Sequence, residues 1–133
     1  TADEILAFSR AADAVHVEEK LMQYAVRLVH ATRTHGRVAL GASPRATLGL
    51  MRLAKAWAFL AGRDYVSPDD LRRLAGPVLE HRVMVTTDAA IEGITSIAVV
   101  REVVGRTRLQ EGSAGVAAPP PDLVIDPRAG GAA

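Results

Sequence analysis

The residues whose types and spacing most clearly suggest a chemical role form the segment GASPRA, residues 41–46. Ser43 is a favourable N-cap, because its hydroxyl can accept a hydrogen bond from a first-turn N–H. Pro44 suits the first helical position, so the sequence predicts a helix that starts here. Arg45 then places a cation at the positive end of the helix dipole, which costs about 0.3–1 kcal/mol. Either an anion bound at this N-terminus offsets that cost, or Arg45 is a solvated side chain that tolerates it.

The other polar residues do not form a catalytic constellation. His30 and His35 lie five positions apart and point about 140° apart on a helix, so they do not form an i,i+4 metal pair. Solvated or capping roles are expected for these two histidines, and the other two are His16 and His81. A cap explains Ser43 better than a nucleophile does, and a helix start explains Asp69 and Asp70. Without a G-x-x-x-x-G-K-[ST] loop, we expect no nucleotide hydrolysis by the chain alone.

Composition indicates one globular domain with an aliphatic core. The chain has 133 residues, of which 49% are hydrophobic, 4% aromatic and 23% charged. A net charge of +1 argues against nucleic-acid or membrane-surface binding. There is no cysteine, no secretory signal and no apolar run long enough to span a membrane. The lack of cysteine does not fix the compartment, and we expect a cytoplasmic protein.

Hydrophobic periodicity predicts amphipathic helices at about residues 3–14, 18–35, 44–61 and 68–79. The second helix carries one apolar stripe, formed by Leu21, Tyr24, Ala25, Leu28, Val29 and Thr32. The stripe of the third comprises Thr47, Leu50, Met51, Ala54, Trp57, Ala58 and Ala61, where Trp57 is read as a core residue. The fourth starts at the cap Ser67 and Pro68, and Pro77 should kink or interrupt it.

The C-terminal third has a mixed pattern. Alternation over residues 81–93 predicts a short two-stranded hairpin, and Thr95 or Ser96 can cap a last helix that ends near Gly105. Its expected inward residues are Ile97, Val100, Val103 and Val104. The predicted fold is mainly α, a bundle of about four to five helices with a short β hairpin, over residues 1–110. Residues 111–133 are a flexible tail by composition, with one apolar patch, Leu123-Val124-Ile125.

Residues 41–82, GASPRATLGLMRLAKAWAFLAGRDYVSPDDLRRLAGPVLEHR, resemble the C-terminal helical lid of MoxR-type AAA+ ATPases. The resemblance extends more loosely over residues 3–105. It implies a bundle that closes over a bound nucleotide. It also implies that Arg45 matches the second-sensor arginine, which reaches the terminal phosphate of ATP, and that Gly41, Ala42 and Ser43 line the same pocket through their backbone.

The family's other ATPase elements are absent from the chain, among them the phosphate-binding lysine loop, the acidic metal-holding strand, the first sensor and the finger arginine. They would belong to a preceding α/β domain, so the chain resembles a lid separated from its ATPase. The resemblance implies that the whole protein uses ATP with Mg²⁺, and we do not expect this fragment to bind the metal. It also implies a hexameric ring, a chaperone-like role in maturing protein complexes, and von Willebrand factor A-type proteins as partners.

Two other classes of function compete with the lid. A free-standing DNA-binding module could use residues 67–73 as the start of a recognition helix, although Asp69 and Asp70 would meet phosphates unfavourably. A helical adaptor could bind a protein partner through the apolar patch at 123–125.

Overall fold

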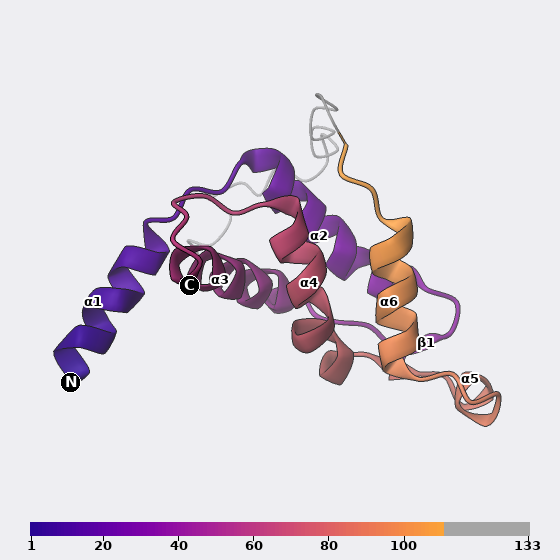
Figure 1. Cartoon of the computed structure of the whole chain (residues 1–133). Helices are drawn as coiled ribbons and strands as arrows, with labels where there is room; N and C mark the ends of the chain where they lie inside the picture. Colours follow the sequence, from indigo (N-terminus) through magenta and orange to yellow (C-terminus); the bar gives the residue numbers. More distant parts are fainter. Residues whose placement is uncertain (111–133) are drawn as a thin grey trace, which may run out of the picture.

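The computed structural model describes residues 1–110, which fold into a helical bundle with a small β ladder (Figure 1). The predicted fold class is confirmed, with six α-helices in the described part of the chain. In chain order the elements are α1 (Ala2–Asp13), α2 (Glu19–Thr34), β1 (Val38–Leu40), α3 (Arg45–Leu60), α4 (Pro68–Leu79), the 3₁₀ helix η1 (Glu80–Arg82), β2 (Met84–Val85), α5 (Thr87–Ile91) and α6 (Ser96–Arg106). The predicted tail, residues 111–133, lies outside the described residues.

The core lies between α2, α3, α4 and α6 (Figure 1). All six residues of the stripe predicted for α2 are buried, as the periodicity requires. From α3 the core receives Leu50 and three alanines, Ala46, Ala54 and Ala58, each with no exposed surface. Small side chains on that face let the neighbouring helices approach closely, so apolar burial here comes mainly from the partners of α3.

Three predicted core positions are wrong. Ala61, the C-cap of α3, is exposed. Trp57 is 36% exposed and lies at the edge of the bundle, where the guanidinium of Arg73 is 4.9 Å from its ring centroid. Ile97 is 44% exposed, and α6 buries Val99, Val100 and Val103 instead. The apolar run of α6 is nearly continuous, so its periodicity alone does not select one buried face.

The β ladder joins segments that are distant in sequence. β1 pairs with β2 in antiparallel fashion, and Val38 lies opposite Val85. The predicted hairpin within residues 81–93 is therefore wrong in its second strand. Residues 87–91 form the short helix α5 instead, capped by Thr86, whose hydroxyl accepts a 3.2 Å hydrogen bond from the Ala89 N–H.

An ion pair organises the start of α4. Arg63 donates two hydrogen bonds to Asp70, each 2.8 Å long, and Asp70 is only 5% exposed. Asp70 also accepts from the Ser67 N–H at 2.8 Å, while the Asp70 N–H donates to the Ser67 hydroxyl at 3.3 Å. This reciprocal capping box confirms Ser67 as the cap and fixes the α3–α4 connection.

The predicted interruption at Pro77 is wrong, because α4 continues to Leu79. Proline removes one backbone hydrogen bond, and its position close to the C-terminus leaves little helix beyond it to destabilise. The chain then tightens into η1.

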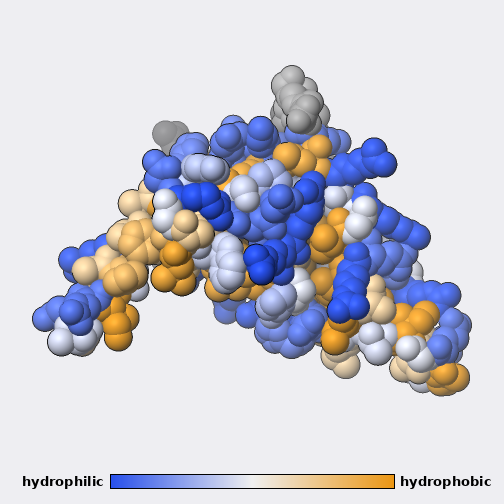
Figure 2. Space-filling view, viewed as in Figure 1, coloured by the Kyte–Doolittle hydropathy of each residue, from blue (hydrophilic) through white to orange (hydrophobic). Residues whose placement is uncertain are grey.

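Helix α1 projects from the bundle and has no buried residue (Figures 1 and 2). It meets α3 through an edge-to-face contact of Phe8 with Phe59, with ring centroids 5.2 Å apart, and through Lys55, whose Nζ donates to the Asp13 carbonyl at 3.0 Å. Ile5 and Leu6 are 68% and 54% exposed. The amphipathic pattern of α1 is confirmed, but its apolar face lies outside the core.

We expect Asp70→Asn to lower the free energy of unfolding at neutral pH by about 1–3 kcal/mol, because it breaks charge-assisted hydrogen bonds. Burial alone raises the pKa of Asp70, but the Arg63 and Ser67 donors outweigh burial and hold this pKa below its ordinary value. The wild-type stabilisation should thus be complete at neutral pH and fade as the pH falls through the lowered pKa. Urea unfolding between pH 7 and pH 3 measures both effects.

Asp69→Asn is the matched control, because Asp69 is adjacent to Asp70 but its side chain is 88% exposed. We expect a loss below about 1 kcal/mol for this variant. Equal losses for the two variants would contradict a special role for the Arg63–Asp70 pair.

Candidate functional site

The GASPRA loop is held against the C-terminal turn of α2. Thr32 is fully buried, and its hydroxyl donates to the Val29 carbonyl at 2.7 Å while it accepts from the Ala42 N–H at 3.0 Å. The side chain of Ala42 is also fully buried. Sequence reasoning placed Thr32 in the buried stripe but missed this bond; the signal was a threonine on an otherwise apolar face, since a buried hydroxyl needs a partner.

Gly41 makes a close backbone approach to α2. A Cβ atom at this position would lie 2.6 Å from the Cα of Arg33 and 2.7 Å from its backbone nitrogen. Neither atom can give way without moving the helix, so a larger residue does not fit. Gly41 and Ala42 therefore have a packing role in this loop, whatever ligand the loop meets.

Helix α3 begins at Arg45, one residue later than predicted. Pro44 occupies the cap position and already has helical dihedral angles, φ −54° and ψ −26°. The predicted side-chain cap by Ser43 is wrong: in the described part of the chain no side chain caps α3, and the Ser43 carbonyl accepts from the Ala46 N–H at 2.9 Å. Ser43 lies one residue before the cap, which leaves its exposed hydroxyl free for another partner.

Arg45 is exposed, and within residues 1–110 it forms no ion pair. The first turn of α3 contains no acidic residue. The partial positive charge of the α3 N-terminus and the charge of the Arg45 guanidinium therefore lie on one surface, without a nearby counter-charge in the described part. Helix N–H groups next to a cation are the arrangement that binds phosphate or carboxylate.

The histidines have other surroundings. His35, between α2 and β1, accepts a hydrogen bond at Nδ1 from the Arg37 N–H at 3.2 Å, which leaves the proton on Nε2. That nitrogen lies 3.3 Å from Glu102 Oε2, so His35 links the α2–β1 connection to α6. Over residues 1–110 no group of three His, Asp or Glu side chains is arranged to hold a metal ion.

No helix of the described part is long and apolar enough to cross a bilayer.

Comparison with known proteins identifies the fold. Residues 30–103 match the family described as AAA lid domain. The chain belongs to this family. The match runs from the last turns of α2 into α6, and so includes the GASPRA loop, the Arg63–Asp70 pair and the β ladder.

The relatives specify the MoxR type of lid. The chain is 38% identical over 107 residues to YeaC of Bacillus subtilis (strain 168), which is named as uncharacterized, with 80% of the chain and 33% of that protein covered. It is 38% identical over 104 residues to "Chaperone MoxR1" of Mycobacterium tuberculosis, with 71% of the chain and 28% of the relative covered. The MoxR-type lid expected from the sequence is thus confirmed.

A solved structure shares the fold. A candidate ATPase from Cytophaga hutchinsonii aligns with a TM-score of 0.74 at 32% identity, over 77% of this chain and 34% of that chain. The lid therefore spans about a third of the length of the proteins it resembles.

We expect Thr32→Val to destabilise the lid by about 1–3 kcal/mol, because the buried Ala42 N–H would lose its acceptor. Thr34→Val is the matched control two residues away, since Thr34 is exposed and its hydroxyl contacts are 3.5 Å long. Urea unfolding of the 133-residue chain compares the two. A loss for Thr34→Val as large as that for Thr32→Val would contradict a specific role for the Thr32–Ala42 bond.

Proposed function

We propose that this lid works in a MoxR-type AAA+ ATPase, where Arg45 is the second-sensor arginine that contacts the terminal phosphate of ATP. The observation that carries the proposal is the position of Arg45: it is exposed, unpaired within residues 1–110, and the first residue of a helix whose own dipole repels it. A phosphate group bound at this helix end would offset that local conflict.

The chemistry suits phosphoryl transfer. The transition state spreads negative charge over the equatorial oxygens of the γ-phosphoryl group, and a positioned arginine stabilises that charge through two N–H donors. Over residues 1–110 no cluster of carboxylates could hold Mg²⁺. In the proposal the metal and the phosphate-binding lysine therefore belong to the preceding α/β domain, and this chain supplies only the arginine edge of the site.

The four residues of the site divide the work. Arg45 reaches the phosphate, and the exposed Ser43 hydroxyl lies beside it in sequence. Gly41 and Ala42 hold the loop in place, because one contacts the backbone of α2 and the other has its N–H bonded to Thr32. A clamped loop favours catalysis, since a charge that is already positioned needs no reorganisation in the transition state.

The lid then converts nucleotide state into movement. Because Arg45 is attached to a packed bundle, gain or loss of the γ-phosphate contact would turn the lid as one body against the α/β domain. The homology to a protein named as a chaperone supports a chaperone-like role. In the proposal this ATPase matures other protein complexes in the cytoplasm. A hexameric ring and von Willebrand factor A-type partners complete the proposal.

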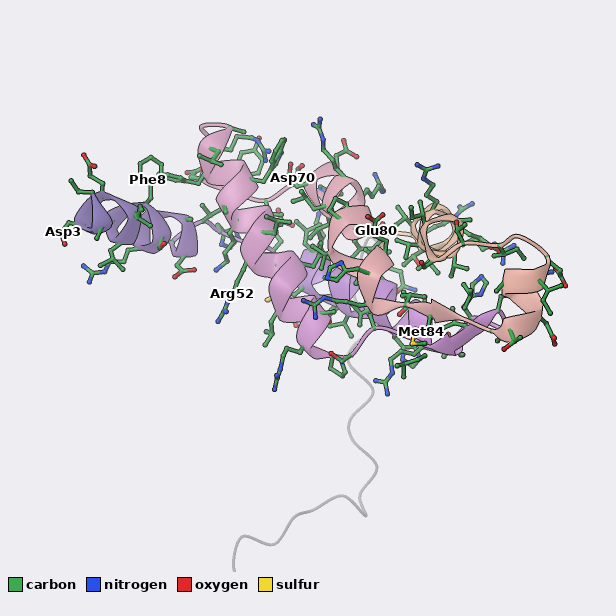
Figure 3. All side chains as sticks on the ribbon, turned by 90° about the horizontal axis from the view of Figure 1, so that it is seen from below. Asp3, Phe8, Arg52, Asp70, Glu80 and Met84 are labelled. Atoms are coloured by element: carbon green, nitrogen blue, oxygen red, sulfur yellow. The ribbon has the colours of Figure 1, made fainter. Side chains whose placement is uncertain are left out.

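Substitution of Arg45 in the full-length protein tests the assignment. We expect Arg45→Ala to lower ATP turnover about 10²-fold or more, the usual cost of removing one transition-state donor. Arg52→Ala is the matched control, because Arg52 is exposed on the same helix about 10 Å further along its axis; Figure 3 shows its side chain extending away from the bundle. Wild-type turnover in Arg45→Ala would refute the assignment, and equal losses in both variants would show a general effect on α3.

Nucleotide affinity provides a second test in the same protein. A contact with the γ-phosphate strengthens ATP binding but leaves ADP binding unchanged, so Arg45→Ala should weaken ATP binding and reduce the preference for ATP over ADP. Equilibrium titration with a fluorescent ATP analogue and its ADP counterpart measures the ratio. A parallel loss for both nucleotides would place Arg45 on another part of the nucleotide.

A further inference from the structure

A groove between α4 and α6 combines an apolar floor with a cationic rim. It encloses about 350 Å³, and its floor includes Pro77, Ile97 and Val104. Arg72 and Arg73 on α4 and Arg101 on α6 line the same groove. Glu80 is the one acidic residue in its lining, and Figure 3 shows it beside α6. This site is separate from the GASPRA loop and has no role in the function proposed above.

The arginines at this groove have few acidic partners within residues 1–110. Arg72 pairs with Asp69 at 2.9 Å, but the Asp69 side chain is 88% exposed, so the pair is weak and exchangeable. Arg73 stacks on Trp57, and Arg101 forms no ion pair in the described part. The groove therefore presents more positive charge than its own residues neutralise.

A second hollow shares Arg72 and Val104 with the first. Arg72, Val104, Arg108 and Leu109 line it. Arg27 from α2 donates through Nη2 to the Arg108 carbonyl at 3.3 Å, while its Nε is buried and, in the described part of the chain, has no hydrogen-bond partner. The bond to Arg108 ties the segment that follows α6 to α2.

The chain itself contains a segment of complementary chemistry. Residues 122–126 read Asp-Leu-Val-Ile-Asp, the apolar patch of the sequence with a carboxylate on each side. We propose that residues 122–126 bind in the α4–α6 groove of their own chain, with Leu123, Val124 and Ile125 against its apolar floor and the two aspartates facing its arginines.

The tether makes this occupant favourable. The described chain ends at Leu109 and Gln110, and Leu109 lines the second hollow. Eleven residues lie between Gln110 and Asp122, which corresponds to a root-mean-square reach of about 20 Å for a flexible linker. Ile97 and Val104 are about 10 Å apart along α6, so the whole groove is within reach. A short flexible tether gives an effective concentration of about 1 mM, so a contact with an intrinsic dissociation constant below that value is populated.

Such a contact would make the groove a regulated docking surface. Another protein with an acidic, apolar segment would have to displace residues 122–126 first, which raises its apparent dissociation constant. The test below therefore includes contact with a second copy of the chain as one of its outcomes.

A single spin label tests the proposal in the 133-residue chain. The chain contains no cysteine, so Ala129→Cys provides one site for a nitroxide next to the proposed segment. We expect paramagnetic broadening of the amide signals of Ile97, Arg101 and Val104, and its loss in Leu123→Ser/Ile125→Ser. Arg101→Glu should reduce the broadening, whereas Arg10→Glu on the projecting helix α1 should leave it unchanged.

Three results would overturn the proposal. Groove signals without broadening would show that the segment does not visit the groove, and broadening that survives Leu123→Ser/Ile125→Ser would show that contact is nonspecific. The third result comes from a mixture of two chains, one ¹⁵N-labelled without a spin label and one spin-labelled at natural isotope abundance. Broadening of the ¹⁵N-labelled signals in this mixture would assign the contact to a second copy. Signals from the core of α2 confirm in each variant that the bundle is folded.

Discussion

The architecture depends on the ion pair between Arg63 and Asp70. It joins the residues that follow α3 to the first turn of α4, and the same carboxylate caps that turn through the Ser67 N–H. Arg63 also donates to the Tyr65 carbonyl at 3.1 Å, and the neighbouring backbone pairs with His16 before α2. Two connections of the bundle, α1–α2 and α3–α4, therefore meet beside this ion pair. A nearly buried pair contributes less to net stability than to specificity, because only one arrangement satisfies all its donors.

Features fixed by local physics could be predicted from the sequence. The stripe of α2 and the Ser67 cap of α4 depend on residues within a few positions of each other, and both are as predicted. The partner of β2 could not be predicted, because two helices separate it from β1 and alternation says nothing about which distant strand it meets. The prediction that Ile97 and Trp57 are buried was wrong for a related reason. Each lies on an apolar helix face that is wider than the surface covered by the neighbouring helices.

The candidate site was found from the sequence in part. The charge conflict at Arg45 is visible in six residues, and the structure retains it: the arginine begins α3 and stays exposed. The bonds that hold the loop were not visible, because Thr32 and Arg33 meet it only after α2 and β1 turn back on each other. The residues of this chain do not identify the ligand, because a helix end and an exposed arginine specify the charge of a ligand and not its identity.

The close approach of Gly41 to Arg33 has a mechanical consequence. With backbone against backbone, the loop has no compressible side chain between itself and α2, and the Thr32–Ala42 bond prevents it from lifting away. A displacement of Arg45 would therefore be transmitted to α2 with little loss. A loop packed through a flexible side chain would instead absorb part of that displacement.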